Sequence, residues 1–206
     1  MKSYIRILLV GLFSVYLVGC SSLKTVEQTA PKISVQKNAE PLVIAVLDQR
    51  PYVLNKDKSP AFEGLIRSGF GIPYSYNTAT REPMSLYLGK RLAHGFKTAG
   101  ITAELYPTSL DVTKGVLLEK LRQNGEKSLV VSFSEWKYAH HAFAKWGFYD
   151  TDIIILDNDG NTLVNKNFAG KDAIPSGVIA NAMQEVYKAR FEAIFADNEV
   201  RQALEH

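Results

Sequence analysis

Cysteine is nearly absent from this sequence, and this limits the chemistry of the folded part. Cys20 is the only cysteine among 206 residues, which excludes an internal disulfide, a cysteine-based zinc site and dithiol chemistry. The sequence also has no strong excess of charge of one sign. It contains 24 Lys and Arg residues and 21 Asp and Glu residues, which gives a formal net charge of +3. We therefore expect no nucleic-acid partner, since such partners require a basic surface.

Motifs for catalysis or cofactor binding are missing as well. No glycine-rich phosphate loop follows a predicted strand, and no serine lies in a nucleophile-elbow pattern. Residues 157–160 (DNDG) indicate a turn, because the other ligands of a calcium loop are absent. His140 and His141 fit an exposed hairpin tip, although a turn could bring them together with Asp150 and Asp152 in a weak metal site. We expect no enzyme activity, no cofactor and no metal.

The first twenty residues have the pattern of a secretion signal. Lys2 and Arg6 precede an apolar run over residues 7–18, which is too short to span a bilayer stably, and Leu17-Val18-Gly19 leads into Cys20. The segment resembles the lipobox of bacterial lipoproteins, in which the signal peptide is removed and the cysteine is acylated. This predicts a signal peptide over residues 1–19 and lipidation at Cys20; an ordinary secretion signal or a membrane anchor is the alternative.

The resemblance to lipoproteins has consequences for the location of the mature protein. Removing Lys2 and Arg6 lowers the formal charge from +3 by two, to +1. Two or three acyl chains on one cysteine bind a membrane more firmly than a single chain does. Ser21 follows the cysteine, and the sorting rule of enterobacterial lipoproteins then implies the outer membrane, facing the periplasm. The periplasmic face of the inner membrane is the alternative.

The rest of the chain is predicted to contain a tether and one domain. Residues 20–40 have no aromatic side chain and no sustained period, which indicates a flexible tether. Residues 41–206 are expected to form a single periplasmic α/β (α+β) domain. It should contain a two-layer mixed sheet of about five strands with helices mainly on one face. The expected order is β-α-β-α-β-β-β-α, with strands near 42–47, 101–106, 128–138, 146–156 and 162–168, and helices near 83–99, 111–123 and from 174 onward.

A family resemblance accompanies this pattern. Cys20, residues 48–50 (DQR), residues 88–101 (LGKRLAHGFKTAGI) and residues 147–170 (GFYDTDIIILDNDGNTLVNKNFAG) resemble the YajG-like outer-membrane lipoproteins, an uncharacterised family. The order of elements is also similar to the N-terminal domain of TolB and to the auxiliary lipoproteins of envelope transport systems. These resemblances imply a binding or scaffolding module without a reaction of its own. The insert over residues 51–82 departs from the YajG pattern.

The long segment over residues 48–82 is the predicted binding loop. It is rich in Gly, Pro, Asn and Ser and combines charge with aromatic side chains, and such loops commonly carry recognition. A protein or glycan of the cell envelope is the expected partner. The purely structural alternative packs Phe62, Ile66 and Phe70 over the sheet edge and pairs Asp48 with Arg50 or Arg67. The candidate binding residues are Asp48, Arg50, Tyr52, Arg67, Phe70, Pro73, Tyr74 and Tyr76.

Two further functions stay open at this point. A small-ligand or glycan-binding domain would use aromatic side chains of the antiparallel strands as a stacking surface. Its candidates are Trp136, Tyr138, Trp146 and Phe148. An envelope hydrolase would need His94 or His140 in one cleft with acids and a serine.

Overall fold

The computed structural model describes residues 22–35, 40–141 and 144–205. Cys20 and the predicted signal peptide lie outside the described residues. The elements, in chain order, are α2 (Val26–Thr29), β1 (Leu42–Asp48), α3 (Pro51–Leu54), β2 (Phe62–Arg67), β3 (Pro73–Asn77), α4 (Met84–Thr98), β4 (Ala103–Tyr106), α5 (Lys114–Asn124), β5 (Ser128–His140), β6 (Lys145–Leu156), β7 (Thr162–Ala173), α6 (Ile179–Phe195) and α7 (Asn198–Glu205).

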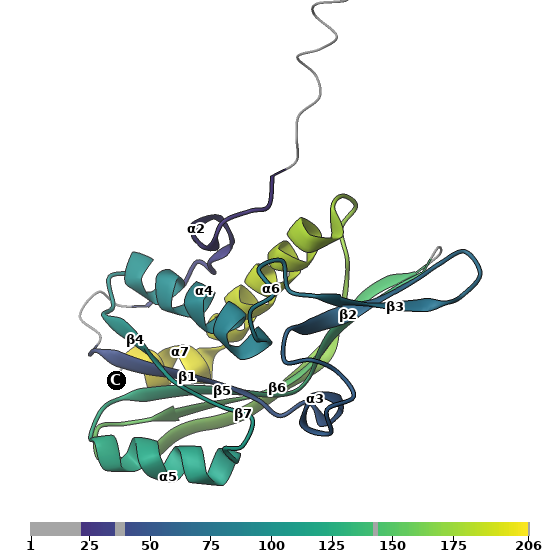
Figure 1. Ribbon diagram of the computed structural model, residues 1–206. Coiled ribbons are helices and arrows are strands. Elements are labelled where there is room, and N and C mark those ends of the chain that lie inside the picture. The colour runs from purple at the N-terminus through teal and green to yellow at the C-terminus, as the bar shows by residue number, and fades with distance from the viewer. Residues whose placement is uncertain (1–21, 36–39, 142–143, 206) are drawn as a thin grey trace, which may run out of the picture.

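The strands form one mixed sheet, which confirms the predicted fold class (Figure 1). Strands β1, β4 and β5 are parallel neighbours, and β5, β6 and β7 form an antiparallel meander. These are the five predicted strands. The sheet has seven, because β2 and β3 form an antiparallel hairpin within residues 48–82, and β2 pairs in parallel with the far end of β5. The expectation of about five strands was therefore too low, and the segment predicted as a long loop without a strand period contains two strands.

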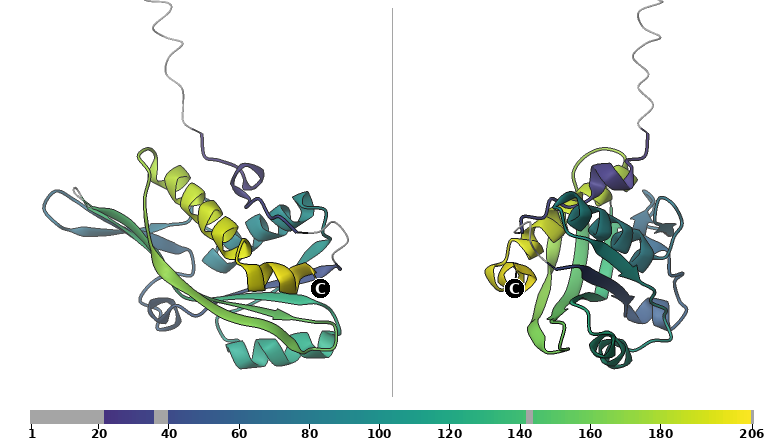
Figure 2. Two further views of the ribbon diagram at one scale, coloured as in Figure 1. Left: turned by 180° about the vertical axis from the view of Figure 1, so that it is seen from behind. Right: turned by 90° about the vertical axis from the view of Figure 1, so that its left-hand side faces the viewer.

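Two hydrophobic clusters cover the two faces of the sheet. Ile44 and Val46 of β1 belong to the larger cluster, beneath α4, α6 and α7, whereas Ala45 and Leu47 belong to a smaller one beneath α5. Successive side chains of a strand point to opposite faces, so the apolar run of β1 is buried on both sides, as predicted for a central strand. Figures 1 and 2 show α5 alone on its face and the other long helices on the opposite one.

Proline and glycine mark the ends of α4 and α5 as the sequence predicts, whereas the start of α6 differs from the prediction. Helix α4 begins after Pro83 and stops before Gly100, which has a φ of 90°, and α5 ends at Gly125, with a φ of 68°. Both residues adopt the left-handed conformation that favours glycine. The last helix was expected to open at residues 174–176, but α6 begins at Ile179 because the chain first turns through Gly177, with a φ of 129°.

The segment before β1 also differs from the expectation. Residues 22–35 were placed in the flexible tether, whereas they contain the helix α2 and pack against α4 and α6 (Figure 2). Thr29, Ala30, Pro31 and Ile33 are buried there. The three apolar side chains among them are too few to produce a periodic pattern, so their burial depends on the surface that α4 and α6 offer.

Candidate functional site

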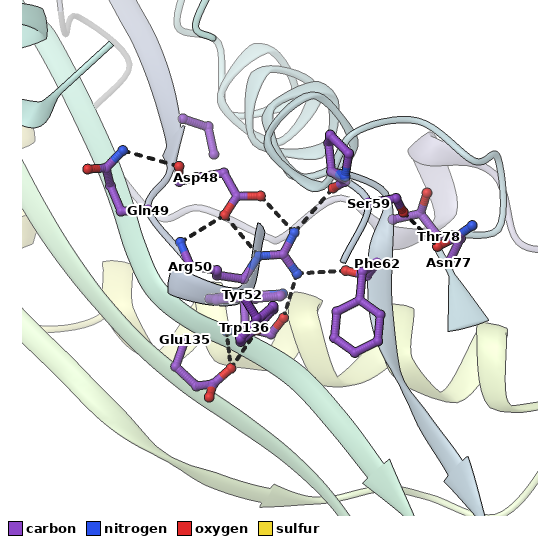
Figure 3. A network of polar contacts seen from close by, with 12 residues as sticks. Asp48, Gln49, Arg50, Tyr52, Ser59, Phe62, Asn77, Thr78, Glu135 and Trp136 are labelled. Carbon is purple, nitrogen blue, oxygen red and sulfur yellow. Dashed lines mark hydrogen bonds and ion pairs between the residues drawn. The ribbon is translucent and has the colours of Figure 1, made fainter. Parts of the chain in front are cut away.

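Asp48 and Arg50, at the end of β1, form a buried ion pair (Figure 3). The exposed fractions are 3% for Asp48 and 0% for Arg50. Arg50 donates from Nε to Asp48 Oδ1 (2.9 Å) and from Nη2 to Asp48 Oδ2 (2.7 Å). It also donates from Nη1 to the carbonyl oxygens of Phe62 (2.6 Å) and Trp136 (3.0 Å), and from Nη2 to that of Pro60 (3.2 Å). The guanidinium thus joins the end of β1 to the start of β2 and to β5.

This ion pair has no donor left for a ligand. An arginine side chain carries five N–H donors, and the five contacts above occupy all of them. Burial lowers the pKa of Arg50, but the hydrogen bond and the charge of Asp48 outweigh it and raise that pKa. The structure thus contains the ion pair of the structural alternative, with Arg50 as the partner. Arg67 lies elsewhere and donates to the carbonyl oxygen of Gly71 (3.2 Å).

Tyr52 continues the same network at the surface. Its hydroxyl donates to Glu135 Oε1 (2.7 Å), and Lys137 bonds the other carboxylate oxygen of Glu135 (2.6 Å). The Tyr52 ring packs edge-on against Phe62, with ring centroids 5.5 Å apart. Burial raises the pKa of Tyr52 above its ordinary value. The hydroxyl therefore stays protonated and acts as a donor that fixes α3 to β5.

The other candidate residues lie on the hairpin of β2 and β3, which extends beyond the rest of the domain (Figures 1 and 2). Ser68 N–H donates to the Ile72 carbonyl (2.9 Å), and Gly71, with a φ of 81°, closes the turn. Phe70 in this turn is 96% exposed, which is the opposite of the packing that the structural alternative predicted for it. Ile72, Tyr74 and Tyr76 are also exposed, and the tip therefore presents a row of uncovered apolar and aromatic side chains.

The root of this hairpin is firmly packed. Phe62 is buried and Ile66 packs against the main core. A Cβ added at Gly64 would lie 2.4 Å from the Tyr138 ring, so only glycine allows β2 to approach β5 this closely. Together with the Arg50 contacts, this packing holds an exposed tip on a rigid base.

The four aromatic side chains proposed as a stacking surface do not come together. Trp136 and Tyr138 are fully buried, and Trp136 stacks on Phe191 of α6 with ring centroids 5.4 Å apart. Trp146 is exposed and lies under the Lys171 ammonium (4.7 Å). A hollow of about 430 Å³ does exist between α6 and the strands β6 and β7, but its aromatic lining is Tyr149 and Phe168.

Sequence reasoning missed a buried polar cluster beneath the hairpin. Glu63 of β2 lies in the core, where its Oε1 accepts from the Tyr187 hydroxyl of α6 (3.1 Å). The Tyr87 hydroxyl and the Gln184 amide are buried without a described partner. Burial raises the pKa of Glu63 to about 8. A glutamate within a strand usually faces water, so no sequence signal indicated this placement.

The residues considered for metal binding or hydrolysis are not assembled into a site. Within the described ranges, no group of three or more His, Cys, Asp or Glu side chains could hold a metal ion. Asp150 and Asp152 both accept from Asn167, and Asp152 pairs with Lys114 (2.7 Å). His94 lines a hollow of about 250 Å³ together with Glu27 and Lys188, and the lining contains no serine.

Comparisons with known proteins support the fold. Comparison with protein-family models finds no match, and comparison with curated protein sequences finds none either. Among solved structures, one similar protein is XCC0632 from Xanthomonas campestris, of the family model DUF330. Its sequence is 12% identical, the alignment covers 89% of this chain and 91% of the Xanthomonas chain, and the TM-score is 0.53. A second solved structure, of an uncharacterised protein, is 11% identical; the alignment covers 83% of this chain and 95% of that one, with a TM-score of 0.49. Lipoprotein GNA1162 from Neisseria meningitidis is 15% identical; the alignment covers 75% of this chain and 98% of the Neisseria chain, with a TM-score of 0.32.

Only the likeness to the Xanthomonas protein supports a conclusion, and it concerns the fold alone. The Xanthomonas protein has the same fold, and the other two superpose too loosely to support a conclusion about this chain. None of the three names describes an enzyme. The resemblance to the YajG-like lipoproteins stays a prediction.

Proposed function

We propose that this chain is a lipid-anchored periplasmic lipoprotein of the outer membrane that acts as a non-catalytic binding or scaffolding module. It binds a protein of the cell envelope through the tip of the β2–β3 hairpin. The observation that carries this proposal is the exposure of Phe70, Ile72, Tyr74 and Tyr76 on a hairpin with a buried root. Aromatic side chains on a rigid support are the usual anchors of a protein interface, because little conformational entropy is lost on binding.

The edge of β3 favours docking by side chains over strand addition. The Ser68 N–H donates to the Ile72 carbonyl oxygen across the hairpin, so residues 72, 74 and 76 direct their backbone groups toward β2 and residues 73, 75 and 77 direct theirs outward. Pro73 has no N–H at the first outward position, and Lys58 covers Ser75 with a hydrogen bond of 2.8 Å. Proline and lysine at an edge oppose pairing with another strand. Binding therefore depends on the apolar side chains of the tip.

The lipid anchor is supported by the leader sequence that ends at Cys20. Among the described residues, no helix is long and apolar enough to cross a membrane. Palmitate labelling followed by membrane fractionation tests the anchor. The wild-type chain should incorporate label and sediment with outer membranes, whereas Cys20→Ser should lose both properties. Incorporation of label by Cys20→Ser would contradict this assignment.

Photo-crosslinking tests the binding surface. A benzophenone amino acid at Tyr74 in intact cells should give one defined protein adduct, while the same probe at Val116 on α5, which is 50% exposed, should not. Phe70→Ser should remove the Tyr74 adduct without changing the melting temperature, because the side chain has almost no contact to lose. Equal adducts from both positions, or an adduct to glycan only, would contradict binding of a protein by the tip.

A further inference from the structure

Residues 22–35, here called the strap, pack against α4 and α6 and begin two residues after Cys20. We propose that the strap holds the acylated end of the chain beside the N-terminal end of α6, so that this end of the domain rests on the lipid headgroups. The inference depends on the lipid anchor proposed above and adds the orientation of the domain to it.

The first part of the strap is attached to α6. Asn181 accepts from the Lys24 backbone N–H (2.9 Å) and donates from Nδ2 to the Ser22 carbonyl oxygen (2.9 Å). One turn further along, Glu185 forms an ion pair with the Lys24 ammonium (2.5 Å). Ser22, the first described residue, is therefore already bound to the helix.

The second part of the strap lies between α4 and α6. Arg91 of α4 donates from Nε to the Thr29 hydroxyl (3.0 Å), and Glu192 of α6 accepts from the Lys32 backbone N–H (2.8 Å). A Cβ at Gly95 of α4 would lie 2.6 Å from the Pro31 carbonyl oxygen, so glycine is required for this approach. These contacts exclude a freely moving linker over residues 22–35.

Chain length then places the anchor close to α6. Cys20 precedes Ser22 by two residues, which span at most about 7 Å between Cα atoms. A flexible tether of about twenty residues would instead allow a root-mean-square separation of about 25 Å. Figures 1 and 2 show that the described chain starts at the same end of the molecule as the connection from β7 to α6. That end must lie at the membrane surface if Cys20 is in the membrane.

The surface at this end suits lipid headgroups. Leu23 is 52% exposed and Val178, immediately before α6, is 48% exposed. Residues 173–181 (AIPSGVIAN) contain no acidic side chain. The nearby carboxylates of Asp172 and Glu185 are paired with Arg190 and Lys24, which weakens their repulsion of anionic headgroups. Exposed apolar side chains gain free energy by entering the interfacial region. In Figure 1 this end lies at the top, whereas the β2–β3 hairpin projects to the right. The tip of the hairpin therefore lies away from the headgroups and is free to bind a partner.

Site-specific fluorescence quenching tests this orientation in the full acylated protein. Because Cys20 is the only cysteine and its sulfur carries the lipid, a new cysteine is the only free thiol. A fluorophore on Val178→Cys is compared with one on Val116→Cys, in liposomes of phosphatidylethanolamine and phosphatidylglycerol with a nitroxide on the headgroup. We expect several-fold stronger quenching at position 178. Equal quenching at the two positions overturns the proposal.

A length variant separates the strap from simple affinity of the surface for lipid. An insertion of about ten Gly and Ser residues between Ser21 and Ser22 leaves the domain unchanged and adds about 16–19 Å of flexible reach. Quenching at position 178 should then fall to the level at position 116. Unchanged quenching overturns the role of the strap. Absence of palmitate incorporation refutes the anchor and this proposal together, whereas equal quenching in a palmitate-labelled protein refutes the orientation alone.

Discussion

We expect the buried carboxyl group of Glu63 to make the stability of the domain depend on pH, and Glu63→Gln to remove this contribution. Burial raises the pKa of Glu63 to about 8 from an ordinary value of 4.5, although the Tyr187 hydroxyl and two positive charges act in the opposite direction. The folded chain thus keeps a proton at neutral pH that the unfolded chain releases. The titratable groups that influence Glu63 are Tyr187, Tyr87, Tyr138, Arg91 and Arg50.

The size of the effect follows from the two pKa values. A raised carboxyl pKa contributes stability that is complete below pH 4.5 and is lost as the pH rises toward 8. At 1.36 kcal/mol per pKa unit, the difference between about 8 and 4.5 corresponds to a total loss of about 5 kcal/mol. Between about pH 5 and pH 7, the free energy of unfolding should fall by about 2–3 kcal/mol. Glutamine keeps an oxygen acceptor for Tyr187 and has no proton to lose.

Urea unfolding at a series of pH values measures this difference. We expect the free energy of unfolding of Glu63→Gln, relative to that of the wild type, to rise by about 2–3 kcal/mol between about pH 5 and pH 7. The difference should level off above about pH 8. Glu119→Gln, at a side chain that is 62% exposed, is the matched control for loss of one carboxylate and should show no such rise. A stability difference that stays constant with pH would refute the reasoning.

Two predictions concern the root of the hairpin. Arg50→Met should lower the free energy of unfolding by about 3–5 kcal/mol, because it leaves a buried carboxylate unpaired. Its control is Arg67→Met, at an exposed arginine, which should change the free energy of unfolding by less than about 0.5 kcal/mol. Gly64→Ala should lower it by about 1–3 kcal/mol, because the new methyl group overlaps the Tyr138 ring. Gly69→Ala is its control, since no atom lies within 4 Å of that position. Urea unfolding measures all four variants, and equal effects in either pair would contradict the contacts described.

Local patterns were sufficient for the regular elements of the domain. The apolar run of β1, the helical spacing before Gly100 and the aromatic, β-branched strands around residues 157–160 each indicated the element that the structure contains. The hairpin of β2 and β3 was missed, because Gly, Pro, Asn and Ser interrupt any period there. Its strands exist because β2 pairs with the extended end of β5, which local sequence does not reveal.

The candidate site was predicted as one group and divides into two in the structure. Asp48, Arg50 and Tyr52 have the composition of a binding site, yet their polar groups are used within the protein. Phe70 was assigned to packing in the structural alternative and is the most exposed of the large apolar side chains named above. Composition identified the segment, but only the neighbours of each side chain determine whether it faces the core or the solvent.

The sequence by itself determined the class of the fold and most of its helices and strands, and it predicts a leader that ends at Cys20, because these features depend on residues a few positions apart. Only the tertiary structure decided that residues 22–35 form a strap, that all N–H donors of the Arg50 side chain are used within the protein, and that Glu63 is buried. Those outcomes depend on partners far along the chain: Lys32 bonds a residue 160 positions away, and Arg50 one 86 positions away. Such contacts arise from the packing of helices on the sheet, and no local pattern encodes them.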